Sequence, residues 1–271
     1  MLMNKKIKIL AMSLLGFGVA QVSMAAPVDL NTWTQESYPA VNGFGSGSWA
    51  VNTDGSSVFQ SVNGQPTLFY SDFSAMGTQV TGKITVTSAS DDDYIGFALG
   101  YNAGDVTNPS ADYLLVDWKR GTQSFDFQSP SNDPGTVAYR GLSVSQVSGI
   151  PSADEFWGHT TLSAGSGLTE LQRATNLGSV GWNVGVEYEF TFDFGPNDLE
   201  VYVNGTKELD ITGSFNNGSL AFYNFSQASV LYSAFDVEQG SFEVTDVPEP
   251  VTLTLMGLGL AGLRLSRRKR N

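Results

Sequence analysis

The sequence predicts an all-β fold in which two sheets stack as a sandwich. From residue 28 to residue 246 no helical periodicity persists for three turns, whereas short alternating runs recur between residues that favour turns. The run Glu187–Phe194 alternates strictly and places four aromatic side chains on one face, as in a strand with one buried and one solvated side. About twelve strands at this spacing require two sheets.

A hairpin is predicted around Asn204-Gly205, because this pair accepts the positive φ angles of a type I′ turn and lies between the alternating runs 199–203 and 206–211. A bulky and a smooth face alternate along 94–101, which is typical of an inner strand. Residues 170–176 are predicted to form one helical turn. The other predicted strands are 84–87, 114–118, 124–128, 141–146, 219–225, 230–238 and 241–244.

The N-terminal segment has the pattern of a secretory signal peptide. Residues 1–25 combine a short basic start, an apolar run over 9–20 and the small residues Ser23 and Ala25 where a signal peptidase cleaves. The sandwich itself is therefore assigned to residues 27–246.

The C-terminal segment, residues 247–271, combines Pro248, Glu249 and Pro250 with an apolar run over 251–263 and a basic cluster. Thirteen residues at about 1.5 Å each form a transmembrane helix of roughly 20 Å, shorter than the ~30 Å hydrocarbon core. The segment resembles a PEP-CTERM sorting signal. That resemblance implies that an exosortase removes the tail after transient inner-membrane insertion, with Pro248, Glu249 and Pro250 as its recognition sequence. An ordinary C-terminal anchor is the alternative.

Composition limits the partners of the body. The chain has no cysteine, which excludes disulfides and thiolate metal sites, and its net charge is −13. Eight of the fourteen Lys and Arg residues lie in the terminal segments, so six remain between them. Such an acidic body disfavours nucleic acid and favours divalent cations and neutral sugars, although an ordinary acidic secreted surface would have the same excess.

Three consecutive carboxylates, Asp91, Asp92 and Asp93, precede the apolar run 94–101. Like charges this close repel one another, so a nearby cation would stabilise them. Calcium suits such a tract, because it takes six to eight oxygen ligands in irregular geometry. A solvated turn, in which the Asp side chains bond their own backbone, is the alternative.

The body resembles the C-terminal domain of thrombospondins over roughly residues 58–238. The matching segments occur in the same order and are 91–97, 115–119, 122–125, 139–144, 157–159, 180–182, 218–222 and 225–227. The resemblance implies a lectin-like jelly roll of the concanavalin or laminin-G type that binds calcium and acts in cell and matrix adhesion. It implies calcium ligands at Asp92 and Asp93, with Asp91 beside them and Asp72 completing the set. Ala234 stands where the family tends to have an acidic residue.

Aromatic side chains suggest a glycan contact. Trp118 and Trp182 are predicted to be core residues, whereas Trp157 lies in a turn-rich stretch and is predicted to be exposed and to stack on a sugar. His159, the only histidine, is predicted to have a packing role.

Catalytic patterns are incomplete. A single histidine excludes a two-histidine zinc site. Glu208 and Asp210 begin the Glu-x-Asp-x-Glu pattern of retaining glucanases, but Thr212 replaces the last Glu, so we predict a solvated edge face there. The sequence therefore predicts an exported calcium-binding, lectin-like adhesion or extracellular matrix protein within the exopolysaccharide or biofilm, not an enzyme. A polysaccharide-active enzyme on a glucanase-like jelly roll and a purely structural surface protein are the alternatives.

Overall fold

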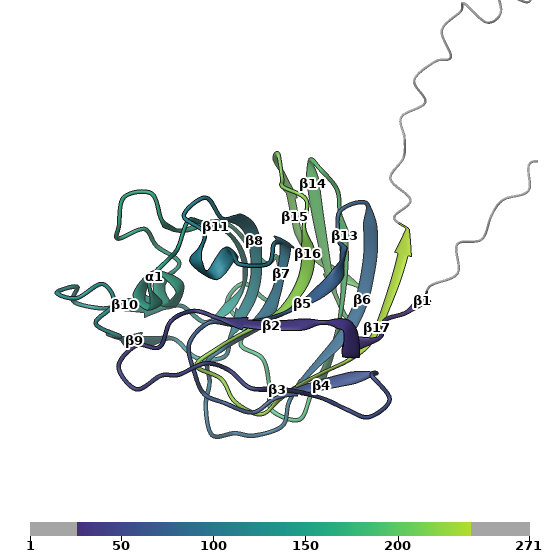
Figure 1. Cartoon of the computed structure of the whole chain (residues 1–271), viewed down its shortest axis with the longest axis horizontal. Helices are drawn as coiled ribbons and strands as arrows, with labels where there is room; N and C mark the ends of the chain where they lie inside the picture. Colours follow the sequence, from purple (N-terminus) through teal and green to yellow (C-terminus); the bar gives the residue numbers. More distant parts are fainter. Residues whose placement is uncertain (1–25, 240–271) are drawn as a thin grey trace, which may run out of the picture.

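The computed structural model describes residues 26–239, which form two antiparallel sheets packed face to face (Figure 1). The predicted sandwich is therefore confirmed. The signal peptide, the strand 241–244 and the sorting tail lie outside the described residues. Among the described helices, none is long and apolar enough to cross a membrane.

The first sheet follows the order β15-β14-β13-β6-β17-β4-β3, with β1 paired to β17. Every pairing in it is antiparallel. Its strands are β1 (Ala26–Pro27), β3 (Trp49–Val51), β4 (Ser57–Gln60), β6 (Thr78–Val86), β13 (Glu187–Phe194), β14 (Asp198–Val203), β15 (Thr206–Thr212) and β17 (Val230–Gln239).

The second sheet follows the order β12-β11-β8-β7-β16-β5-β2. A separate ladder of β9 (Gln123–Phe125) and β10 (Thr136–Ala138) lies next to the short helix α1 (Ala153–Gly158), and two 3₁₀ turns cover Leu30–Thr32 and Asp105–Thr107. The strands of this sheet are β2 (Thr34–Ser37), β5 (Thr67–Ser74), β7 (Tyr94–Tyr101), β8 (Asp112–Lys119), β11 (Gly141–Ser148), β12 (Gly167–Arg173) and β16 (Ser219–Phe225).

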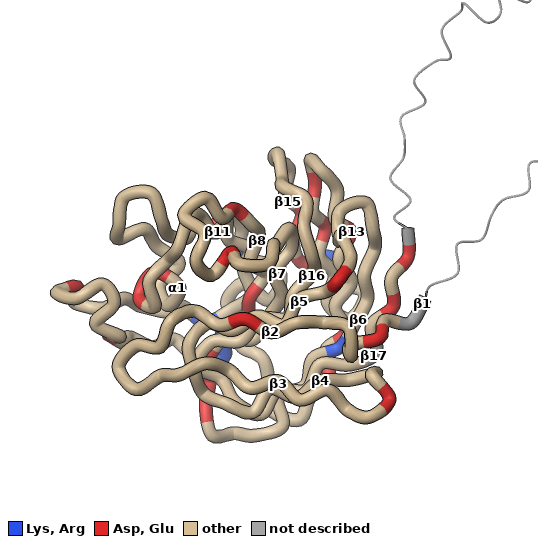
Figure 2. Tube along the Cα trace, viewed as in Figure 1, with Lys and Arg blue, Asp and Glu red and all other residues tan. Residues whose placement is uncertain are grey.

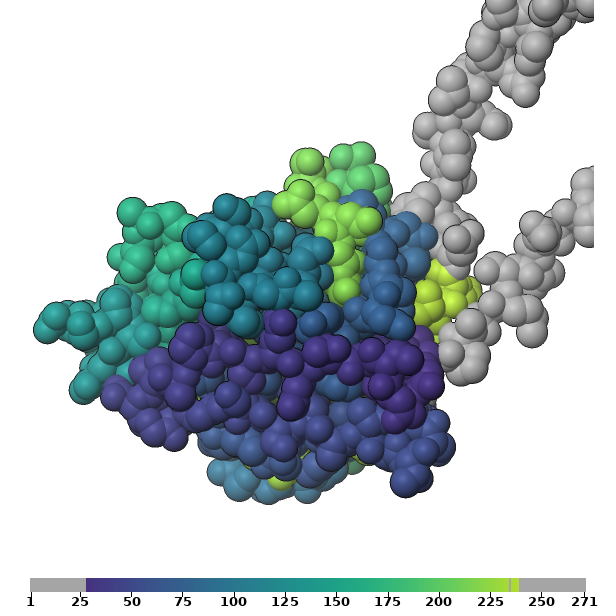
Figure 3. All heavy atoms as spheres, in the orientation of Figure 1, coloured from purple at the N-terminus to yellow at the C-terminus, as the bar shows by residue number. Residues whose placement is uncertain are grey.

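The central strands of the second sheet, β7, β8 and β16, are buried on both faces, whereas its edge strands β2 and β12 are partly exposed. Ile95, Phe97 and Leu99 of β7 enter the core between the sheets, where they meet the aromatic face of β13 that the alternation predicted. Tyr94 and Ala98 enter a second apolar cluster, which is covered by α1 and by Phe127. α1 and the segments around it cover one end of this outer face, where they pack beside the sheet (Figures 1 and 3).

Two local predictions were wrong. Residues 170–176 do not form a helical turn: 167–173 is the edge strand β12, because its backbone pairs with β11. The helix α1 was not predicted, although Ser152 and Glu155 form a capping box at its start. Residues 167–173 form a strand because they pair with β11, a contact that the local sequence does not reveal. Helix α1 has only six residues, which is too short to give a periodic hydrophobic pattern.

Candidate binding site

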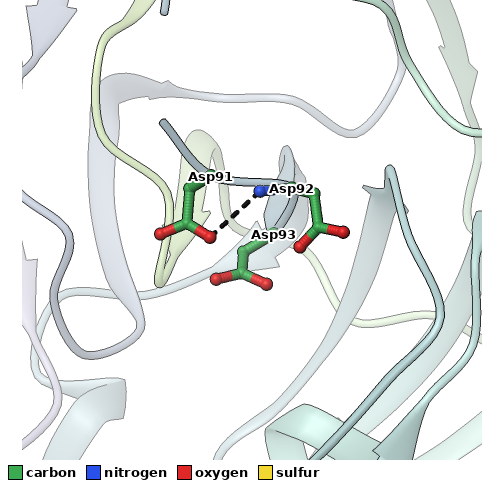
Figure 4. A group of neighbouring side chains, drawn as sticks. All are labelled: Asp91, Asp92 and Asp93. Carbon is green, nitrogen blue, oxygen red and sulfur yellow. Dashed lines mark hydrogen bonds between the residues drawn. The ribbon is translucent and has the colours of Figure 1, made fainter. Parts of the chain in front are cut away.

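The acidic tract lies in the loop from β6 to β7, at the end of the sandwich where β7 begins. Figure 4 shows Asp91, Asp92 and Asp93 side by side, and one carboxylate oxygen from each lies within 4.8 Å of the others. Asp91 and Asp92 are partly exposed, whereas Asp93 is buried. The Asp92 backbone N–H donates to Asp91 Oδ1 at 3.0 Å.

A buried lysine from the neighbouring strand neutralises the innermost carboxylate. Lys119, the last residue of β8, lies opposite Tyr94 in the ladder. Its Nζ is fully buried, lies 2.5 Å from Asp93 Oδ1 and donates to the Asp92 carbonyl at 3.0 Å. Burial raises the pKa of Asp93 to about 7, against the opposing effect of the Lys119 charge. Lys119 thus supplies part of the positive charge that three adjacent carboxylates need.

The backbone of the tract is held from three sides. The N–H groups of Arg120 and Gly121 donate to the Asp92 carbonyl, and a Cβ on Gly121 would collide with Asp92 Oδ2. Trp182 Nε1 donates to the Asp93 carbonyl at 3.0 Å, and the Asp93 N–H donates to Gln227 Oε1 at 3.0 Å. The three carboxylates therefore occupy a preformed arrangement that repulsion alone would disperse.

A calcium ion fits the outer part of this tract. Asp92 has a side chain that is 43% exposed, and Asp91 accepts only amide donors from Asn63 and the backbone. Asp92 Oδ1 lies 3.4 Å from Lys119 Nζ, so Lys119 partly engages Asp92 as well as Asp93, and the oxygens left for a hard cation are those of Asp91 and Asp92 Oδ2. The outer pair fits the ion, and Asp93 fits it poorly.

Asp72 does not complete the tract. It lies on β5 between Tyr70 and Ser74, whose partners on β16 are Ala221 and Ser219. On the other side of β16, Leu220 pairs with Leu99 of β7. Asp72 is thus level with Leu99, about six residues or roughly 20 Å along the strand from Asp93. The structure brings Asp91, Asp92 and Asp93 together and leaves Asp72 exposed at the other end.

A hollow of about 160 Å³ opens beside the tract. Aromatic and polar side chains line it together, and Asp91 and Asp93 are among them. Its lining residues are Phe44, Asn63, Asp91, Asp93, Gln123, Phe125, Phe127, Trp157 and Ser226.

The prediction that Trp157 is exposed was wrong, because the tryptophan is only 1% exposed. Helix α1 places it beneath β9, where it packs on Tyr94, Phe127 and Phe225. Trp157 still lines the hollow, and its buried Nε1 has no hydrogen-bond partner among the described residues. The accessible ring is Phe125, at 37% exposure, which the sequence reasoning missed. Trp118 and Trp182 are core residues, as predicted.

His159 is buried and packs on the ring of Tyr94, at 5.2 Å between centroids, in line with the predicted packing role, and it is also held in a buried ion pair. Its Nε2 lies 3.0 Å from Asp117 Oδ2, and its Nδ1 lies 3.7 Å from Glu170 Oε2. Burial alone would lower the pKa of His159, but the charge and hydrogen bond of Asp117 outweigh it and raise the pKa to about 9. Ser145 Oγ lies 3.4 Å from Nδ1, but an imidazolium has no lone pair to accept a serine proton. The group is therefore not a hydrolase triad at neutral pH.

Glu208 is not on a solvated face, which corrects the expectation for this strand. Its carboxylate is buried and accepts from the backbone N–H groups of Asn176 at 2.8 Å and Leu177 at 3.1 Å. Asp210 is exposed and pairs with Lys207. The carboxylates of β15 thus have structural partners.

Comparison with solved structures finds resemblances of low identity. The carbohydrate binding module CBM66 from Bacillus subtilis has a TM-score of 0.47 at 12% identity, over 76% of this chain and 95% of that chain. The Ca²⁺/Man-bound VIP36 exoplasmic/lumenal domain has a TM-score of 0.46 at 12% identity, over 79% and 85%.

Relatives found by sequence have a higher identity to this chain than these solved structures have. Thrombospondin-3b of Danio rerio is 25% identical over 195 residues, which are 69% of this chain and 20% of the relative. Thrombospondin-2 of Gallus gallus is 25% identical over 206 residues, which are 70% and 16%. The chain thus spans a fifth or less of the length of these relatives.

Two family models match consecutive parts of the chain. The thrombospondin C-terminal region matches residues 45–239, and the PEP-CTERM protein-sorting motif matches residues 246–270. Together they support a secreted or surface protein with a lectin-like domain. The chain belongs to the family of the thrombospondin C-terminal region and carries a PEP-CTERM sorting motif behind that domain.

Proposed function

We propose that this chain is an exported, calcium-binding adhesion or extracellular matrix protein whose lectin-like sandwich binds glycan. The observation that carries the proposal is the acidic tract beside an aromatic hollow at one end of the sandwich. Lectin function needs apolar ring faces and polar groups that bind sugar hydroxyls, and the two occur together there.

Calcium would be held by Asp91 and Asp92, with Lys119 neutralising Asp93. The ion would supply the positive charge that the outer pair lacks and would fasten the loop from β6 to β7. Figure 2 shows how few basic residues the described chain has to offset its many acidic ones, so a divalent ion is a favourable partner.

The position of the tract suits a protein held by its C-terminal end. β17 begins at Val230, which pairs with Val86 just before the tract, and ends at Gln239 beside Thr78. Ten residues of strand span about 30 Å, so the chain leaves toward the sorting motif from the opposite end. Before the tail is removed, the glycan site would therefore lie at the end that faces away from the membrane.

Exosortase processing is the second part of the proposal. Pro248, Glu249 and Pro250 would be recognised while residues 251–263 are transiently in the inner membrane. Intact-mass measurement of the secreted protein should show a C-terminus near Pro250 without the basic cluster. A secreted or surface form that retains Arg264 to Asn271 would contradict processing.

The function is tested by glycan binding with and without a chelator. We expect the purified protein to bind a subset of glycans on an array in millimolar calcium and to lose that binding in excess EDTA. Asp92→Asn should lose it as well, whereas Asp72→Asn, a matched charge removal at an exposed position of β5, should retain it. Binding to no glycan in either condition would contradict the lectin part of the proposal.

A polysaccharide-active enzyme is the rival, and no observation in the described residues favours it. The only histidine is paired with Asp117, and Glu208 is engaged by backbone donors. Activity on β-glucans that disappears in a Glu208→Gln variant with unchanged stability would establish the rival.

A further inference from the structure

We infer that the hollow beside the tract is a subsite for one neutral sugar ring, with Phe125 as its stacking platform. The inference rests on the proposed glycan-binding function and assigns it residues and a ligand class. The hollow lies where β9, α1 and the loop between β2 and β3 meet, so its walls come from segments far apart in the sequence.

The aromatic wall is rigid and partly open. Phe125 packs edge-on against Phe127, with ring centroids 4.6 Å apart, and against Phe44, at 5.8 Å and 83°. Trp157 lies behind Phe125 at 6.1 Å. The buried rings fix the orientation of Phe125, which remains 37% exposed. Such an exposed ring offers a flat apolar face to the C–H groups of a pyranose.

Neutral hydrogen-bonding groups also line the hollow, namely the amides of Asn63 and Gln123 and the hydroxyl of Ser226. Asn63 donates to Asp91 and accepts from Ser226, and Gln123 Oε1 accepts from Lys119 Nζ, so the donor and acceptor positions that remain are those that can bind sugar hydroxyls. The volume of the hollow, about 160 Å³, is below the roughly 300–1,000 Å³ of pockets that hold drug-sized ligands, which suits one ring rather than an extended chain.

The charges around the hollow select against ionic sugars. Among the described residues no Lys or Arg lines the hollow, so a uronic or sulfated sugar would find no basic side chain to pair with there. The ammonium group of an amino sugar would bind best between the Asp93 carboxylate and the Trp157 ring, which both attract a cation. Lys119 already occupies this position, because its Nζ pairs with Asp93 and lies 4.6 Å from the Trp157 ring centroid. Of the three classes of sugar, the hollow therefore suits a neutral one best.

The experiment measures binding of matched oligosaccharides by calorimetry in millimolar calcium. The panel contains glucose, galactose and mannose oligomers, with glucosamine and glucuronate oligomers of equal length as charged counterparts. We expect a neutral member to bind best, and Phe125→Ala to weaken it about tenfold, because losing the apolar contact of one aromatic side chain costs about 1.5 kcal/mol or more. Phe125→Tyr, which keeps the ring face, should bind within about threefold of the wild type.

Tyr139→Ala is the matched control, because Tyr139 is 60% exposed and lies outside the hollow. It should leave binding unchanged. Neutral-sugar binding that is insensitive to both Phe125 variants would overturn this inference and leave the proposed function standing. Strongest binding of a charged oligomer that depends on Phe125 would overturn the neutral class alone. Binding of no oligosaccharide would overturn both.

Discussion

Replacing Lys119 by methionine should lower the free energy of unfolding by about 3–5 kcal/mol, the range measured when one partner of a buried ion pair is removed. Lys119 Nζ is fully buried and pairs with Asp93 and the Asp92 carbonyl, so its loss leaves a buried carboxylate beside two others. Methionine keeps most of the apolar stem. Denaturant unfolding of both proteins measures the difference.

A double variant separates charge from packing. Asp93→Asn removes the charge that Lys119 neutralises. The double variant Lys119→Met, Asp93→Asn should therefore lose clearly less free energy of unfolding than the sum of the losses in the two single variants. Because the pKa of Asp93 is raised from 3.8 to about 7, its ionisation opposes folding as pH rises through that window. The Lys119→Met loss should therefore shrink at mildly acidic pH. A loss below about 1 kcal/mol at neutral pH would show that Lys119 does not neutralise the tract.

Stability should also fall by about 3 kcal/mol as pH rises from about 6.5 to about 9, owing to His159. The pKa of His159 is raised on folding, so its contribution is fully present below the unfolded value of 6.5 and is lost as pH passes about 9. The protonated ring pairs with buried Asp117 and with Glu170, whose own pKa this hydrogen bond lowers.

Denaturant unfolding across this range, with His159→Gln as the comparison, measures the effect. The variant should be less stable than the wild type at about pH 6.5, and its stability should depend much less on pH up to about pH 9. Other groups, Asp93 among them, titrate in both proteins, so the difference isolates His159. Parallel pH profiles would contradict the ion pair.

The sequence was a good guide where local patterns decide structure. The Asn204-Gly205 hairpin and the aromatic face of β13 follow from turn chemistry and from the period-two alternation of strands, and both are present. The acidic tract was found as well, since three adjacent carboxylates need no tertiary information to be noticed.

Long-range pairing determined what the sequence did not reveal. Lys119 reaches the tract only because the ladder of β7 and β8 places it opposite Tyr94, and no local pattern gives that register. Trp157 is buried because a six-residue helix turns it under β9, which its turn-rich neighbourhood concealed. Phe125 is accessible because it lies on β9, which pairs only with β10 in a short two-stranded ladder and is not part of either large sheet.

The most direct test of the account is a calcium titration by calorimetry on the purified protein, repeated with Asp92→Asn and Asp72→Asn. The account predicts heat from calcium binding in the wild type and in Asp72→Asn, and its loss in Asp92→Asn. A hundredfold excess of calcium over Kd should also stabilise the domain by about 2.7 kcal/mol, raising Tm by about 5–10 °C over the value in EDTA. The same titration curve in all three proteins, or an equal Tm with and without EDTA, would contradict it.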